Sequence, residues 1–177
     1  MAGPDIIPKV IHQIQLGGSL SKSKSYFYQK THKIYPNYKM KLWGDSNITR
    51  KNFPFTYDVL KNMLSLQNKH DNMLAIITKI MRNEILFHEG GFWKDTGLNI
   101  LQPAFDSFLK YSVVVEAKLL GSHGWSQGTS FYANRPRVKY LQRMVSQPSI
   151  NRIRIHSENP LASAGTLDFW QVMNTYS

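Results

Sequence analysis

An α/β fold with a mostly parallel central sheet flanked by helices is the prediction for this 177-residue chain. The order of the expected elements predicts this fold. Short β-branched or alternating segments alternate along the chain with segments of helical periodicity, which is the order that builds a parallel sheet. No internal repeat and no linker rich in proline and glycine divides the chain, so one domain covering residues 1–177 is expected.

The first half of the chain gives the clearest elements. Residues 6–14 are β-branched and apolar and predict a buried strand, which Gly17 and Gly18 end. The apolar residues of 72–88 recur at helical spacing, and Gly90-Gly91 follows as at a helix end. The other expected helices cover 21–35, 55–68, 103–110, 136–147 and 161–176, and the other expected strands cover 38–43, 92–94, 98–101, 111–116 and 127–133.

Charge and composition restrict the class of partner. Lys and Arg number 22 against 11 for Asp and Glu, which gives a net charge of +11 and favours anionic partners. The absence of cysteine excludes a disulfide framework and a thiolate nucleophile. No apolar run is long enough to span a bilayer and no signal peptide is recognisable, so a cytoplasmic protein without a transmembrane segment is expected.

The segment 82–97 carries the sharpest functional signal. A long helix leads through Gly90-Gly91 into a short strand, and Asp95 and Thr96 follow that strand directly. Ligands of open α/β sheets bind outside the carboxyl ends of strands, so Asp95 is a candidate binding residue. A role for Asp95 in capping a turn is the alternative.

Two separate blocks resemble glycosyltransferase family 32, which contains the Asp-x-Asp sugar-binding region. Residues 7–17 (Ile-Pro-Lys-Val-Ile-His-Gln-Ile-Gln-Leu-Gly) are similar to the family opening Ile-Pro-Lys-x-Ile-His-Gln-Ile-Trp-x-Gly. Residues 78–97 resemble its helix, double glycine and Gly-Gly-x-Tyr-x-Asp-x-Asp motif. The resemblance implies a GT-A-like (Rossmann-like) domain that transfers a hexose from a nucleotide diphosphate sugar to a glycan or protein acceptor.

The chain departs from the family pattern at three positions. Gln15 replaces the tryptophan that stacks on the base, Lys79 replaces a helix aspartate, and Gly97 replaces the second aspartate of the metal motif. The site therefore becomes more positive by three charge units, two at Lys79 and one at Gly97. Asp95 alone remains to hold Mn²⁺ or Mg²⁺, so a metal site would be weakened.

The resemblance implies roles for the residues that match. Asp95 and Arg82 would be catalytic, with Asp95 also the metal ligand. Lys79 and Lys94 would supplement the metal as a cationic clamp on the diphosphate; alternatively, Lys94 points to solvent and Lys79 pairs with Glu84 or Asp95. The expected nucleotide-sugar-binding residues are Gln15, Leu16, Gly17, Lys79, Arg82, Trp93, Lys94, Asp95 and Thr96.

Two other functions stay open on the sequence. Loss of the tryptophan and of two acids fits a non-catalytic protein that binds a nucleotide sugar or glycan. A basic nucleic-acid-binding protein is a third reading, because basic residues concentrate in 135–154. The chain holds no recognised nucleic-acid motif, which disfavours that reading.

Overall fold

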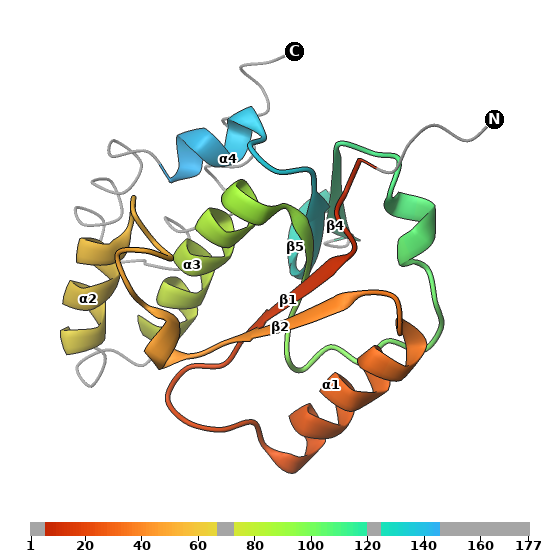
Figure 1. The fold of residues 1–177 in the computed structure, drawn as a ribbon, viewed down its shortest axis with the longest axis horizontal. Coiled ribbons are helices and arrows are strands. Elements are labelled where there is room, and N and C mark those ends of the chain that lie inside the picture. The colour runs from red at the N-terminus through yellow and green to blue at the C-terminus, as the bar shows by residue number, and fades with distance from the viewer. Residues whose placement is uncertain (1–5, 67–72, 120–124, 146–177) are drawn as a thin grey trace. The chain divides into compact units, whose positions relative to one another are not determined.

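A computed structural model describes residues 6–66, 73–119 and 125–145. The chain divides into two compact units. The first holds the chain up to Asp45 together with Glu89–Pro136, and the second holds Ser46–His88 and the chain from Arg137 onward. Figure 1 shows the elements of each: the sheet and α1 belong to the first unit, and α2, α3 and α4 to the second.

The first unit is built on a five-stranded sheet with the order β2-β1-β3-β5-β4. β1 pairs in parallel with both β2 and β3, whereas β5 runs antiparallel to β3 and β4. Four strands therefore share one direction and β5 is reversed, which confirms the predicted α/β fold with a mostly parallel sheet. The strands are β1 (Val10–Ile14), β2 (Lys39–Trp43), β3 (Gly91–Lys94), β4 (Val113–Leu119) and β5 (Trp125–Asn134).

The helical parts of the first unit are α1 (Lys22–Ile34) and the 3₁₀ turns η1 (Asp45–Asn47, at the boundary of the units) and η3 (Phe105–Phe108). α1 begins where predicted, because the Ser21 side chain accepts a hydrogen bond from the Lys24 backbone N–H. The strand predicted over 98–101 is wrong. The backbone N–H of Leu98 closes a turn onto the Asp95 carbonyl, and residues 98–101 take no regular structure.

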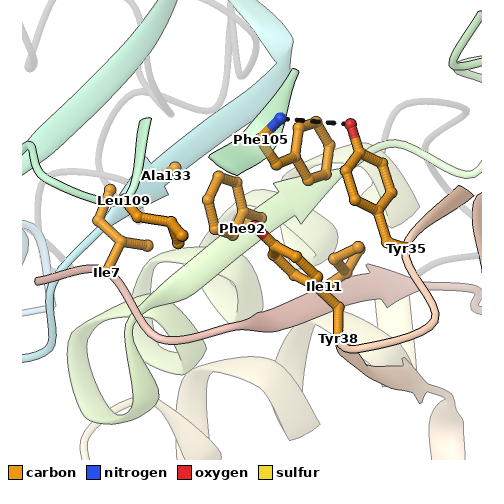
Figure 2. Close-up of a cluster of buried hydrophobic side chains, with 8 residues drawn as sticks. All are labelled: Ile7, Ile11, Tyr35, Tyr38, Phe92, Phe105, Leu109 and Ala133. Atoms are coloured by element: carbon orange, nitrogen blue, oxygen red, sulfur yellow. Dashed lines mark hydrogen bonds between the residues drawn. The ribbon is translucent and has the colours of Figure 1, made fainter. Parts of the chain in front are cut away.

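One face of the sheet packs on an aromatic core (Figure 2). The strand register sets Ile11, Phe92 and Ala133 in one row. Phe105 of η3 stacks on Phe92 with ring centroids 4.7 Å apart, and Tyr35 stacks on the other side of Phe105 at 4.3 Å. The full cluster is Ile7, Ile11, Tyr35, Tyr38, Phe92, Phe105, Leu109 and Ala133.

The second unit contains the helices α2 (Tyr57–Leu66), α3 (Met73–Glu89) and α4 (Lys139–Met144). The last residue of α3, Glu89, belongs to the first unit. α4 starts later than predicted, because Arg137 has a φ of 56° and is not helical. The helix predicted over 161–176 lies outside the described residues. No helix in the part of the chain that the structure describes is long and apolar enough to cross a membrane.

Candidate functional site

Asp95 lies directly after β3, at the carboxyl end of the parallel strands. Its backbone N–H donates to the Ser130 carbonyl on β5 at 2.9 Å, and its side-chain Oδ1 accepts from the Gly97 N–H at 2.8 Å. The side chain is exposed, and Oδ2 accepts no hydrogen bond from the described residues. Asp95 therefore caps a turn, as the alternative reading expected, and also presents carboxylate oxygen to solvent.

Trp93 and Thr96, on either side of Lys94 and Asp95, are buried in the first unit. Trp93 is 2% exposed, and the register sets it between His12 of β1 and Tyr132 of β5. Thr96 lies in the turn and is 6% exposed. The indole of Trp93 is thus buried, and its role in binding the nucleotide sugar stays a prediction.

Lys94 is fully buried, which the sequence did not suggest. Its ammonium Nζ donates to the Asp95 carbonyl at 3.1 Å. Burial lowers the pKa of Lys94 to about 8, although the neighbouring Asp95 carboxylate acts in the opposite direction. The alternative in which Lys94 points to solvent is therefore wrong, and a positive charge lies beneath the Asp95 turn.

The segment after β1 forms the second part of the site in the first unit. Gln15 is half-buried, with its Oε1 accepting from Lys24 Nζ at 3.2 Å. Leu16 is buried, and the exposed Gly17 has a φ of 71° and donates its N–H to Asp45 Oδ2 at 3.0 Å. β1 and β3 are parallel neighbours, so this segment and the Asp95 turn leave the same edge of the sheet.

The cationic residues expected to assist belong to the second unit. Lys79 and Arg82 lie three residues apart on α3, and Arg82 is 4% exposed. Burial lowers the pKa of the half-buried Lys79, and the nearby Arg82 charge lowers it further. Because Lys94 belongs to the first unit, the gathering of Lys79, Arg82 and Lys94 into one cationic clamp stays a prediction.

Glu84, named above as a partner for Lys79, has other partners within the second unit. Its carboxylate accepts from the backbone N–H groups of Phe55 at 2.8 Å and Thr56 at 3.1 Å, and from the Thr56 hydroxyl. These donors come immediately before α2 begins at Tyr57. Glu84 is fully buried and ties α3 to the start of α2, which is a structural role.

The donor atoms of the first unit suit a hard divalent cation. Asp95 offers carboxylate oxygen, the ligand that Mg²⁺ and Mn²⁺ prefer, whereas the exposed Gly97 offers only its backbone. Across the described ranges 6–66, 73–119 and 125–145, no three His, Asp or Glu side chains gather closely enough to hold a metal. One carboxylate is only part of the ligand set of such a cation, so a metal site at Asp95 stays a prediction.

Two residues near Asp95 escaped the sequence analysis. Gln13 of β1 is fully buried and its amide Nε2 donates to the Asp95 carbonyl at 3.4 Å. Glu116 lies at an irregularity of β4, and its Oε2 accepts from the N–H of Ser130, the residue bonded to Asp95. In both cases the available signal was a polar residue in a strand rich in β-branched apolar residues.

Comparisons with known proteins identify the fold. No family model and no curated protein sequence matches the chain. The solved structure of the PaToxG glycosyltransferase matches with a TM-score of 0.74 at 16% sequence identity, over 96% of this chain and 70% of that one. At this identity the match shows a shared fold, and membership of family 32 stays a prediction.

Proposed function

We propose that the chain is a glycosyltransferase that moves a hexose from a nucleotide diphosphate sugar to a glycan or protein acceptor. The observation that carries the proposal is the exposed Asp95 carboxylate, fixed at the carboxyl end of β3 in a fold shared with the PaToxG glycosyltransferase. Ligands of open α/β sheets bind at this edge.

Different residues of the first unit would bind the metal, the diphosphate and the base of the nucleotide sugar. Asp95 would hold Mg²⁺ or Mn²⁺, which when bound neutralises charge on the departing diphosphate. Gln15 and Leu16 would contact the base, and Gly17 gives the close approach that its positive φ allows. Thr96, in the same turn, would contact the nucleotide sugar, and the buried Lys94 donates to the Asp95 carbonyl.

The residues of the second unit would add fixed positive charge. Arg82 would contact the diphosphate or the sugar, and Lys79 would take over part of the role of the metal. In the transfer itself, the bond from the anomeric carbon to the phosphate oxygen would break, and the nucleotide diphosphate would leave with the electron pair. The oxygen of an acceptor hydroxyl would form the new bond to the anomeric carbon, and its proton would pass to the departing diphosphate. A cation with both lysine and arginine nearby would stabilise the diphosphate as it departs.

The replacement of acids by Lys79 and Gly97 favours a second candidate function, a non-catalytic protein that binds a nucleotide sugar or glycan. A catalytic protein must bind the donor and turn it over, whereas a non-catalytic protein binds the nucleotide sugar or a glycan without turnover. Release of free nucleotide diphosphate in the presence of acceptor separates them.

A thermal-shift panel of nucleotide sugars, each with Mn²⁺, Mg²⁺ or EDTA, tests the proposal. A ligand at about 100 times its Kd stabilises the folded state by about 3 kcal/mol. We expect one donor to raise Tm and the metal to enlarge the rise. Stabilisation that persists in EDTA would assign the diphosphate to fixed cations, and no shift with any donor would overturn the proposal.

Two substitutions assign the roles. Asp95→Ala is expected to abolish the metal-dependent part of the shift, whereas Asp58→Asn, at a side chain 66% exposed, should preserve it. Unchanged metal dependence in Asp95→Ala would remove its assigned role. Lys79→Asp restores an acid on α3, and we expect the donor-induced shift to become more dependent on metal.

A further inference from the structure

The backbone carbonyl of Asp95 accepts hydrogen bonds from three donors. The Leu98 N–H donates at 3.1 Å, Lys94 Nζ at 3.1 Å and Gln13 Nε2 at 3.4 Å. A carbonyl oxygen has two lone pairs, and the Leu98 bond alone suffices to close the turn. The two side-chain donors are therefore additional, and they converge on one atom from two strands.

Both side chains incur a cost in this arrangement. Lys94 and Gln13 are fully buried, and a buried ammonium loses more hydration than a single carbonyl restores. Gln13 Oε1 is buried and accepts no hydrogen bond from any described residue. An apolar pair of similar size would avoid both costs, so stability alone does not account for these residues.

The contacts fix the position of the Asp95 carboxylate. The N–H of Asp95 is bound to Ser130, its carbonyl to Gln13 and Lys94, and its Oδ1 to Gly97. Backbone anchors on both sides leave the side chain little freedom, although it is exposed. A ligand carboxylate held in this way needs less ordering when it binds a cation.

We propose that Gln13 and Lys94 are positioning residues that hold the turn of Asp95 so that its carboxylate faces the donor and cation. The proposal rests on the proposed function. It gives Lys94 a role beneath the binding site, in place of direct contact with the diphosphate. It also makes Gln13 part of the site, although Gln13 reaches Asp95 only through the backbone.

The test uses Lys94→Met, which keeps the length of the side chain and removes its donor and charge. Lys110→Met removes the same charge from an exposed position and controls for the change in net charge. Amide hydrogen exchange of residues 95–98 is followed by NMR without ligand, Tm is measured at neutral pH, and the affinity for Mn²⁺ alone is measured by titration.

We expect Lys94→Met to lower the protection of the 95–98 amides, to weaken Mn²⁺ binding about tenfold, and to raise Tm by about 4 °C because a buried charge is removed. Lys94→Gln, which restores a neutral donor, should recover most of the protection and affinity. Gln13→Met should weaken Mn²⁺ binding in the same direction. Lys110→Met should change none of the three quantities.

The outcomes separate this inference from the proposed function. Unchanged protection in Lys94→Met, or a fall in Tm together with affinity, would overturn the positioning role while leaving donor binding by Asp95 intact. Failure of the unmodified protein to bind either Mn²⁺ or any nucleotide sugar would overturn the proposed function. In that case lost protection would show that the contacts are purely structural.

Discussion

Protonation of His12 in β1 should destabilise the first unit in acid. The ring is fully buried, with Nδ1 accepting from the indole N–H of Trp43 at 3.2 Å and Nε2 lying 3.0 Å from the Gly90 carbonyl. An indole nitrogen only donates, so the proton of the neutral ring is on Nε2. The charged groups facing the ring are Glu89, 3.9 Å from Nε2, and Lys41, which pairs with Glu89 at 2.5 Å.

Burial lowers the pKa of His12 from 6.5 to about 4, and the attraction of Glu89 only partly opposes this. The unfolded chain therefore takes up a proton as the pH falls through 6.5, whereas the folded chain does so only near pH 4. The contribution of His12 to the free energy of unfolding is therefore constant above pH 6.5, falls as the pH is lowered from 6.5 to about 4, and is constant again below that. The total loss is about 3 kcal/mol, at about 1.4 kcal/mol for each pKa unit.

The assay is the free energy of urea unfolding at pH 7 and pH 5, measured by circular dichroism for the unmodified protein and for His12→Gln. The glutamine does not titrate and keeps a donor for the Gly90 carbonyl. Between pH 7 and pH 5 the free energy of unfolding should therefore fall by about 2 kcal/mol less in His12→Gln than in the unmodified protein. His32→Gln, at an exposed position, should keep the original pH dependence. Equal pH dependence in His12→Gln and the unmodified protein would refute the reasoning.

Two further predictions concern structural residues, Gly91 in the first unit and Glu84 in the second. Gly91→Ala should cost about 3 kcal/mol, because its φ is 93° and a Cβ would lie 2.6 Å from the Val10 carbonyl oxygen; Gly18→Ala, with a φ of 127° and no atom within 4 Å, should cost less in the same urea titration. Glu84→Ala should cost about 3 kcal/mol, because the N–H groups before α2 lose their acceptor. A Glu84→Ala protein with the original urea midpoint would contradict that role.

The elements that the sequence predicts well are those with a local signal. Ser21 marks the start of α1 through its own hydrogen bond, and the apolar spacing of 72–88 predicts α3 (Met73–Glu89) to within a residue at each end. The strand expected over 98–101 fails because its apolar pattern competes with the Asp95 turn, which removes Leu98 from any ladder. Side-chain and backbone hydrogen bonds, such as the Ser21 cap and the Asp95 turn, decide whether such a segment forms the expected element, and an apolar pattern alone does not reveal them.

The residues of the site also differ in how far the local sequence predicts their positions. The position of Asp95 at a strand end follows from the order of local elements, so the sequence predicts it. The contact from Gln13 joins residues 82 positions apart and depends on the parallel pairing of β1 with β3, which no local pattern specifies. The burial of Lys94 also opposes the general tendency of lysine to be solvated, so only the assembled sheet reveals it.

The net charge of +11 overstates the number of cations that are available to bind an anionic partner. In the first unit, Lys41 is paired with Glu89, Lys24 donates to Gln15 and Lys94 donates to a backbone carbonyl. These cations serve contacts within the fold, so counting them as an attraction for nucleic acid overstates it. The net charge of the chain therefore does not by itself locate an anion-binding site, because each of these side chains already has a partner within the fold.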